Sequence, residues 1–464
     1  MNSHALRPLG STGLLCHPLG FGSYRISNGI AVHKAALRHY LAQGGNLIDT
    51  SANYTDGSSE TLIGEVIKEF RQSGPIVVTK AGYVQGENMR LAQSRSFPEV
   101  VKYGQGLWHC IHPEFLQTQV ERSLRRLQLD AIDVFLLHNP EYFLSERARH
   151  QKVDASLHGR FYERIARAFA FLEDKVKEGS VRWFGISSNN FGLATSHPQM
   201  TSVERCWKEA ERITTDHHFR VIQLPMNLYE SGGALEHNNT GQTVLEFCDR
   251  KRLGVLVNRP LNAFSGNSLI RLADFSDPGA KTPSDNQASL LQRLREHETR
   301  LRTQFAVPFM GSSERSLSGT IEGIIPQVSS AEEWDQVVQR HLAAPIAQWI
   351  EDVQSRVGQQ PEFSSWLQQF FEILSETFEK VELQIRARQQ VVSDTVRYRL
   401  MKSGYPHESQ SLSQMALGTL ISLQGVSSVL VGMRKPAYVD DAMGSVSISS
   451  ETAKSVLSDF SHVT

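Results

Sequence analysis

The chain has few cysteines, almost no net charge and no long apolar run, and each absence excludes a class of protein. Its four cysteines stand far apart among 464 residues, with no Cys-x-x-Cys pair. We therefore expect buried free thiols in a reducing compartment, not a disulfide framework. The net charge of -1 gives no overall attraction to nucleic acid or to anionic lipid. No apolar run approaches the roughly 20 residues that span a bilayer.

The first residues of the given sequence show no recognisable targeting signal. Its first ten residues, MNSHALRPLG, have neither the apolar core of a secretory signal nor the character of an Arg- and Ser-rich amphipathic presequence. We therefore expect a cytoplasmic protein with no membrane partner.

One short stretch, HCIH at residues 109–112, places three potential metal ligands together. A closed zinc site needs four well-placed ligands. Pro113 follows the stretch directly and is typical of the first position of a helix. We therefore expect no metal site here.

Eight short apolar runs alternate with amphipathic segments along the chain. Their Val, Ile, Leu and Phe residues occupy both the odd and the even positions of each run, which is typical of parallel strands that are covered on both faces. The runs occupy residues 17–24, 46–50, 75–80, 131–138, 181–188, 219–227, 253–261 and 427–433. Strand and helix in alternation predict an α/β fold, either a closed barrel or a doubly wound open sheet.

The positions of the polar residues favour the barrel. Nearly every run ends on a polar side chain. In a (β/α)8 TIM barrel, the catalytic residues lie at these carboxyl ends of the strands. An open nucleotide-binding sheet would show a Gly-rich turn after its first strand. Here GFGSYR has Arg25 where that motif needs its third glycine.

A long segment interrupts the strand and helix period after strand seven. About 145 residues separate that strand from the next helix, far more than a usual connection. Their apolar stripes on charged faces predict a large helical insertion between strand 7 and helix 7. We predict barrel parts at 1–264 and 406–464 and an insertion at 265–405, with its core built from aromatic residues: Trp334, Trp349, Trp366, Phe370 and Phe371. The insertion could be a lid, an oligomer contact, a partner dock or simple rim packing.

Four polar residues of the first four strands are predicted to meet at one rim. Asp49, Lys80 and His138 end strands two, three and four, and Tyr54 follows strand two. A free phenol has a pKa near 10, and an adjacent lysine held by a carboxylate would lower it. Such a phenol can donate a proton to a carbonyl oxygen, and a neutral histidine can orient and polarise the same carbonyl. A hydride donor would have to come from a cofactor.

Five motifs in order resemble the aldo-keto reductase family. They are NLIDTSANYTDGSSETLIGEVI with its Asp-x4-Tyr spacing, VVTKAG, IDVFLLHNPE, VRWFGISSNNF and VLVGMRKPAYVDD. The resemblance implies that Tyr54 is the proton donor, that Asp49 and Lys80 tune it, and that His138 orients the substrate carbonyl. It also implies an NADPH cofactor, with NAD possible.

The resemblance further implies where that cofactor binds. Gly22, Ser23 and Tyr24 would lie on the nicotinamide side, and Ser187, Ser188 or Asn189 would hold the carboxamide together with Gln223. Arg434 after Gly432 would grip the adenosine 2′-phosphate, since a guanidinium there favours NADPH over NADH. Asp441 would lie near the adenine. The chain departs from the family at strand seven, where Asn258 replaces a stacking aromatic and Arg259 would instead reach the pyrophosphate.

Two functions remain open from the sequence. The first is an oxidoreductase that moves hydride between NADPH and an aldehyde, ketone or sugar carbonyl, in either direction, with a small carbonyl or alcohol as its partner. The second is a cofactor-binding regulatory or scaffold protein whose helical insertion is the partner surface.

Overall fold

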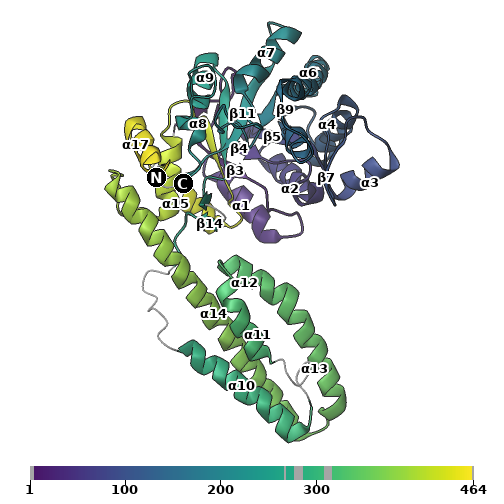
Figure 1. The fold of residues 1–464 in the computed structure, drawn as a ribbon, viewed down its shortest axis with the longest axis vertical. Coiled ribbons are helices and arrows are strands. Elements are labelled where there is room, and N and C mark those ends of the chain that lie inside the picture. Colours follow the sequence, from purple (N-terminus) through teal and green to yellow (C-terminus); the bar gives the residue numbers. More distant parts are fainter. Residues whose placement is uncertain (1–4, 266–267, 276–285, 308–315, 462–464) are drawn as a thin grey trace. The chain divides into compact units, whose positions relative to one another are not determined.

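In the computed structural model, eight parallel strands form a closed barrel (Figure 1). Neighbours around the barrel follow the chain order, and the last strand pairs with the first. The strands are β3 (Leu19–Gly22), β4 (Leu47–Asp49), β5 (Ile76–Ala81), β9 (Ile132–His138), β10 (Val181–Ser187), β11 (Phe219–Pro225), β12 (Gly254–Asn258) and β15 (Ser428–Val431). The (β/α)8 barrel predicted from the sequence is confirmed.

Burial on both faces explains the continuous apolar runs of these strands. All six residues of β5 are buried, as are six of the seven in β9. One set of side chains forms an apolar cluster with members from most strands of the barrel, among them Leu47, Val78, Val134, Val221 and Leu256. Residues of the other parity face the surrounding helices, so neither face of a strand tolerates alternating polar residues.

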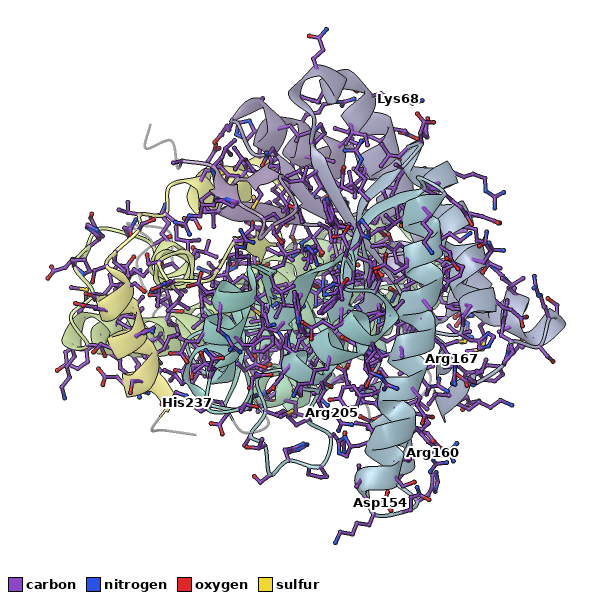
Figure 2. The ribbon with its side chains drawn as sticks, turned by 90° about the horizontal axis from the view of Figure 1, so that it is seen from above. Lys68, Asp154, Arg160, Arg167, Arg205 and His237 are labelled. Carbon is purple, nitrogen blue, oxygen red and sulfur yellow. The ribbon has the colours of Figure 1, made fainter. Side chains whose placement is uncertain are left out.

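The helices that surround the barrel bury one stripe each. Asp154 accepts a hydrogen bond at the start of α6, and Arg160 and Arg167 follow along its exposed side (Figure 2), while Phe161 and Ile165 are buried. The other barrel helices are α1 (Ala31–Ala42), α2 (Ser58–Ile67), α4 (Pro113–Leu127), α7 (Val203–Ile213), α9 (Val244–Lys251), α15 (Leu412–Ile421), α16 (Pro436–Met443) and α17 (Ser450–Ser461); α6 itself spans Ala155–Lys177.

The structure also contains several short strands and helices outside the barrel sheet, which were not predicted from the sequence. Strands of two to four residues show too few alternations for a period to be read. They form the pair β1 (Arg7–Pro8) and β2 (Leu15–Cys16), the sheet of β6 (Tyr83–Val84), β7 (Val101–Gly104) and β8 (Leu107–His109), and the pair β13 (Asn262–Ser265) and β14 (Ser268–Arg271). Short helices are η1 (Tyr54–Gly57), η2 (Lys68–Ser73), α3 (Gly86–Ser94), α5 (Tyr142–Arg147) and α8 (Gly232–Leu235).

The structure describes residues 5–265, 268–275, 286–307 and 316–461. The chain divides into one compact unit of Met1–Ala273 with Arg399–Thr464 and a second of Asp274–Tyr398. These borders lie inside the predicted insertion limits of 265 and 405, and the predicted insertion residues 276–285 and 308–315 lie outside the described ranges. Within the described ranges, no helix has both the length and the apolar character to cross a membrane.

The second unit lies within the limits predicted for the insertion between strand seven and its helix. Its regular elements within the described residues are all helices. Its last helix, α14, continues beyond the unit to residue 402. Its elements are α10 (Asn286–Phe305), α11 (Leu317–Ile324), η4 (Ile325–Gln327), α12 (Ala331–Val337), the π-helical η5 (Val338–Leu342), α13 (Ala343–Val357) and α14 (Pro361–Lys402). The suggested role of this unit in protein contacts stays a prediction.

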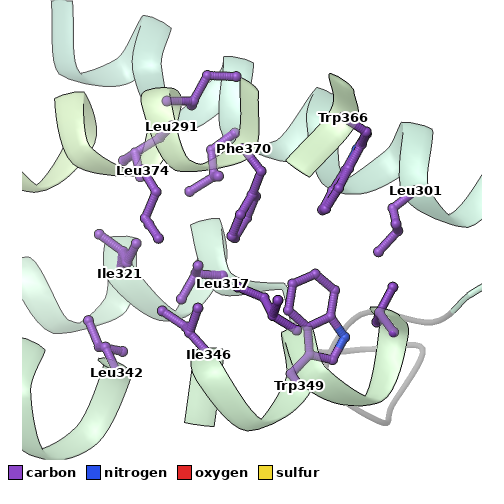
Figure 3. Packing of buried hydrophobic residues seen from close by; sticks show 14 of the residues in the cluster. Leu291, Leu301, Leu317, Ile321, Leu342, Ile346, Trp349, Trp366, Phe370 and Leu374 are labelled. Carbon is purple, nitrogen blue, oxygen red and sulfur yellow. The ribbon is translucent and has the colours of Figure 1, made fainter. Parts of the chain in front are cut away.

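An aromatic core holds this second unit together. Trp349, Trp366 and Phe370 are buried among Leu301, Leu317 and other apolar side chains (Figure 3), and Trp334 is buried as well. Phe371, however, is 48% exposed, so its predicted place in the core is wrong. One residue turns a helix by about 100°, so Phe371 cannot share the inward direction of Phe370.

The wall of the barrel gives a first test of the fold. A Cβ atom added to Gly185 in β10 would lie 1.7 Å from the Val221 carbonyl oxygen, whereas one added to Gly159 in α6 meets nothing within 4 Å. We expect Gly185→Ala to lower the free energy of unfolding by about 1–3 kcal/mol or more. Gly159→Ala should raise it by about 1 kcal/mol through helix propensity. Urea unfolding of both variants checks this; equal effects would contradict the packing described here.

Candidate active site

The carboxyl ends of three neighbouring strands bring Asp49, Lys80 and His138 together. Asp49 ends β4, Lys80 is the last residue but one of β5, and His138 ends β9. These strands are parallel neighbours, with β4 beside β5 and β5 beside β9. Their ends therefore share one rim of the barrel, as the sequence predicts.

A buried ion pair lies at the centre of this group. The Lys80 Nζ donates to Asp49 Oδ1 at 2.6 Å and to the Thr50 carbonyl oxygen at 2.8 Å. Lys80 has no exposed surface, and Asp49 has almost none. Burial raises the pKa of Asp49 and lowers the pKa of Lys80, and the attraction between the two groups opposes both shifts. Each charge depends on the other, because an unpaired charge at this depth would be strongly destabilising.

Tyr54 lies beside this ion pair. The Lys80 Nζ is 5.1 Å from the centroid of the Tyr54 ring, and the rings of Tyr24 and His138 meet it edge to face at centroid distances of 5.1 Å and 6.0 Å. Burial raises the pKa of Tyr54 well above 10, and the Asp49 carboxylate adds to the shift. The predicted lowering of this pKa is therefore wrong, because burial and the Asp49 carboxylate both favour the neutral phenol.

A strained turn holds Tyr54 in place. Thr55 and Asp56, the next two residues, both have left-handed backbones, with φ of 46° and 54°, which non-glycine residues seldom adopt. Two bonds stabilise the turn. The Thr55 hydroxyl donates to the Ile26 carbonyl oxygen at 2.7 Å, and the Glu87 backbone N–H donates to Asp56 at 3.1 Å. Strain of this kind is typical of functional sites, where the surrounding structure fixes one geometry.

His138 ends β9 and is buried at the rim. Burial lowers its pKa well below 6.5, and the positive charge of Lys80 lowers it further. Its Nδ1 lies 3.0 Å from the hydroxyl of Ser51, and its ring meets Tyr83 edge to face at 4.6 Å. Ser51 did not emerge from the sequence as a site residue. The signal was its parity, since residues two apart in an extended segment share a side and Ser51 follows Asp49 by two.

The polar residues of the HCIH stretch, 109–112, have structural roles near His138 and at the start of α4. His109 bonds through Nε2 to the His138 carbonyl oxygen at 2.7 Å, Cys110 is buried, and the side chain of His112 accepts a hydrogen bond at the start of α4. No group of three or more His, Cys, Asp or Glu side chains in the described part of the chain is placed to hold a metal ion.

Gln223 contacts the ion pair directly. It donates from Nε2 to Asp49 Oδ1 at 2.7 Å, and its Oε1 accepts from Ser187 at 3.0 Å and from Asn258 at 3.1 Å. Sequence reasoning places Gln223 and Ser187 on the cofactor carboxamide. In the structure both side chains instead bond within the protein, toward Asp49.

The loop after β10 presents the rest of the predicted carboxamide set. Ser188 is buried, and its hydroxyl accepts the Asn190 backbone N–H at 3.1 Å. The Asn189 side chain is exposed, while its backbone N–H donates to Glu141 Oε1 at 2.8 Å. Glu141 follows β9 and was not singled out from the sequence. Asn189 is therefore the member of this set whose side chain is free to reach a ligand.

The loop after β3 carries the three residues predicted beside the nicotinamide. Gly22 ends β3, and a Cβ atom there would lie 3.2 Å from the Val431 carbonyl oxygen. The Ser23 backbone N–H donates to the Asp49 carbonyl oxygen at 3.0 Å, and its hydroxyl accepts from Ser59 at 2.8 Å. Tyr24 is 63% exposed and packs against Tyr54. Tyr24 thus offers a free surface next to the phenol, whereas the Ser23 hydroxyl is already engaged.

The segment after β15 places the predicted phosphate residues at the start of α16. Gly432 is exposed, and a Cβ atom there would meet nothing within 4 Å. Arg434 is half-buried just before the N-cap of α16, Lys435, and has no ion-pair partner among the described residues. Asp441 instead accepts hydrogen bonds from Ser411, at 2.7 Å, and from Ser413. These bonds engage both carboxylate oxygens of Asp441, which its predicted adenine contact would need.

Three buried polar atoms at the carboxyl ends of β9 and β12 have no hydrogen-bond partner in the described part of the structure. They are Glu141 Oε2, Asn258 Oδ1 and Arg259 Nε. Arg259 also has a left-handed backbone and bonds to Glu230 at 3.1 Å. Buried polar atoms are normally satisfied, so unsatisfied atoms at one rim indicate a place for a polar ligand.

Comparison with known proteins identifies the family of the chain. The model of the aldo/keto reductase family matches residues 18–303. The chain belongs to this family. The match begins just before β3 and covers the strands that carry Asp49, Lys80, His138 and Gln223.

Individual relatives are distant. The chain is 28% identical over 190 residues to an NADH-specific methylglyoxal reductase of Escherichia coli, covering 39% of this chain and 51% of that protein. It is 28% identical over 229 residues to a 6-dehydroglucose reductase of Novosphingobium aromaticivorans, covering 45% and 63%. The chain thus spans about half the length of the first relative and less than two thirds of the second. A solved aldo-keto reductase of Bacillus halodurans in its holo form has a TM-score of 0.49 and 15% identity, covering 98% of this chain and 96% of that one.

Glu141 gives the site a measurable pH dependence. Burial raises the pKa of Glu141 to about 7, from its usual 4.5. Between these values the folded protein holds a proton that the unfolded chain has released, so stability falls as the pH rises. Replacing Glu141 by Gln removes this cost. We compare the free energy of unfolding of Glu141→Gln with that of the parent at each pH. We expect the variant's advantage to be about 3 kcal/mol larger at about pH 8 than at about pH 4.

Urea unfolding at both pH values measures this difference. Glu121→Gln, at an exposed position of α4, is the matched control and should leave the two curves parallel. Parallel curves for Glu141→Gln as well would show that Glu141 ionises as it does in water.

Proposed function

We propose that the protein is a nicotinamide-dependent oxidoreductase that reduces an aldehyde, ketone or sugar-type carbonyl, or runs the reverse reaction. The observation that carries this proposal is the buried Lys80–Asp49 ion pair at 2.6 Å, with Lys80 5.1 Å from the Tyr54 ring centroid. A purely structural tyrosine needs no buried ammonium beside it. A phenol that gives up its proton does, because the ammonium stabilises the phenolate that remains.

The residues at the rim fit a nicotinamide dinucleotide. Gly432 leaves open space beside α16, Arg434 offers a guanidinium without an ion-pair partner in the described ranges, and Asn258 Oδ1 is a buried acceptor that lacks a donor. Arg434 would hold a phosphate, and Asn189 and Asn258 would serve a carboxamide. When bound, the nicotinamide supplies or takes up the hydride.

The chain's own residues handle the proton. The raised pKa of Tyr54 keeps the phenol protonated at neutral pH, so its proton is available to the carbonyl oxygen. Lys80, neutralised by Asp49 in the resting site, stabilises the phenolate as the proton leaves. Neutral His138, whose ring centroid lies 6.0 Å from that of Tyr54, would contact the same substrate.

Aromatic rings beside His138 would shape the substrate site. Tyr83 lies against His138 and Tyr142, and Tyr103 lies against Tyr142. The short sheet of β6, β7 and β8 carries Tyr83 and Tyr103. We therefore place the substrate's variable part against these rings, while the reacting carbonyl lies between Tyr54 and His138.

Tyr54→Phe tests the proton donor. This change removes one hydroxyl, and general acid catalysis typically contributes about a hundredfold to ten-thousandfold. We expect kcat for NADPH-dependent reduction of a carbonyl panel to fall by that amount, with the dissociation constant for NADPH nearly unchanged. Tyr229→Phe is the matched control, because Tyr229 is also half-buried and packs against Phe460. Full activity of Tyr54→Phe would overturn the assignment.

Arg434→Ala tests the phosphate contact. A charge-assisted bond to the 2′-phosphate contributes about 1.5–3 kcal/mol, so NADPH binding should weaken by roughly tenfold to a hundredfold. NADH lacks that phosphate, and its binding should change little. Fluorescence titration with both cofactors measures the two dissociation constants. Arg182→Ala is the control, because Arg182 lies at the amino end of β10, away from the rim that carries Ser187. Equal losses for both cofactors would place Arg434 on another part of the dinucleotide.

A further inference from the structure

Arg149, which follows α5 by two residues, carries a positive charge that has no direct carboxylate partner. Its side chain is exposed. Its Nη1 donates to the Tyr103 carbonyl oxygen, and its guanidinium lies over the Tyr103 ring, with Cζ 3.7 Å from the ring centroid. It makes no ion pair with any residue that the structure describes. The aromatic ring, not a carboxylate, therefore holds this cation in place.

Other arginines around α5 are paired. Arg147 lies 3.3 Å from a carboxylate oxygen of Glu146, and Arg164 lies 3.1 Å from one of Glu99. An exposed arginine without such a partner is often only solvated. Arg149 differs from that case because its contact with an aromatic ring fixes the position of the guanidinium.

The contact with the ring leaves most of the Arg149 donors available. A guanidinium has five N–H groups in a planar fork, and its attraction to the face of a ring uses none of them as a hydrogen-bond donor. Among the described residues, only Nη1 has an acceptor. The remaining donors can form paired, charge-assisted bonds to the oxygens of a carboxylate or a phosphate. Arg149 is thus positioned to receive an oxyanion.

A row of aromatic rings connects Arg149 with the candidate active site. Tyr103 meets Tyr142 edge to face at a centroid distance of 4.8 Å, and Tyr142 meets Tyr83 at 5.3 Å. Tyr83 in turn meets His138 at 4.6 Å. All three tyrosines are half-buried, so part of each ring remains accessible. We call these three rings the aromatic path; it leads from His138 to Arg149.

The path and the cation favour one class of ligand together. An aromatic body gains free energy by covering accessible ring surface. An anionic group at its far end gains a charge-assisted bond to Arg149. A neutral body of the same shape gains only the first of these contributions, so the rim distinguishes the two by charge.

We propose that Arg149 determines substrate specificity by binding an oxyanion at the end of the substrate that does not react. This proposal rests on the carbonyl oxidoreductase function proposed above. The substrate is then an elongated carbonyl compound: its carbonyl lies between Tyr54 and His138, its aromatic body lies along the aromatic path, and its carboxylate or similar group meets Arg149.

Binding of ligands that lack a reactive carbonyl tests the recognition without turnover. Biphenyl-4-carboxylate and biphenyl-4-carboxamide share one body and differ in charge. Isothermal titration calorimetry of the full-length protein, with and without NADP⁺, should show the carboxylate binding about threefold to tenfold more tightly. This range is modest because Arg149 is exposed. The preference should shrink as salt is added, since salt screens exposed charges.

Three variants assign the preference to one side chain. Arg149→Gln should remove it and leave the affinity for the amide nearly unchanged. Arg149→Lys should keep part of it, because an ammonium retains the charge but lacks the planar fork. Arg147→Gln is the matched control, since Arg147 is also exposed, lies two residues away and is paired with Glu146; it should keep the full preference.

The parent protein can overturn the proposal by itself, whether or not the variants fold. Equal affinities for the acid and the amide would exclude recognition of the anion. Absence of binding by both ligands would exclude the aromatic path. A preference that survives Arg149→Gln would assign the anion to another residue.

A reactive pair separates this proposal from the proposed function. 4′-Formylbiphenyl-4-carboxylate and its carboxamide carry an aldehyde at the other end of the same body. We expect kcat/KM for NADPH-dependent reduction to favour the acid about threefold to tenfold in the parent and in Arg147→Gln, but not in Arg149→Gln. Turnover without this preference would overturn the substrate class alone. Preferential binding of the acid without turnover of any aldehyde would support the anion site and count against the proposed function alone.

Discussion

The ion pair between Lys80 and Asp49 is the interaction on which the site depends. Neither charge is tolerable alone where they lie, since Lys80 has no exposed surface at all. The pair also orders its neighbours. Asp49 accepts from Gln223, and Gln223 is itself held by Ser187 and Asn258. Strands β4, β5, β10, β11 and β12 are therefore linked through side chains as well as through the barrel wall.

This arrangement separates the two tasks that a proton donor needs. In the structure, burial and the Asp49 carboxylate favour the neutral phenol of Tyr54, so the phenol keeps its proton. In the proposed reaction, the phenolate that remains after proton transfer would add a second negative charge beside the same ammonium. The stabilisation would then appear in the state where charge develops and be small in the state before it, which is the condition for faster chemistry instead of tighter binding.

The sequence predicted the fold, and it predicted that the central residues would lie together, for a reason that residue types make clear. Asp49, Lys80 and His138 end apolar runs, and in a closed parallel barrel the ends of neighbouring strands must meet. What the sequence could not predict is which partner each polar group takes at short range. Gln223 and Asp441 lie on the expected segments, yet Gln223 bonds to Asp49, and Asp441 bonds to Ser411 and Ser413. Those choices depend on shifts of a few ångströms that no spacing rule contains.

The turn after β4 shows how accuracy and stability can oppose each other in one loop. Thr55 and Asp56 both adopt a backbone that glycine would accept without strain. Glycine at either position would relieve that strain and remove the side-chain bond to Ile26 or Glu87 that anchors the loop. The lost hydrogen bond would offset the relieved strain, and the aromatic ring that precedes the turn would be held less firmly. The cost in strain is thus a measure of how narrowly the direction of one hydroxyl is specified.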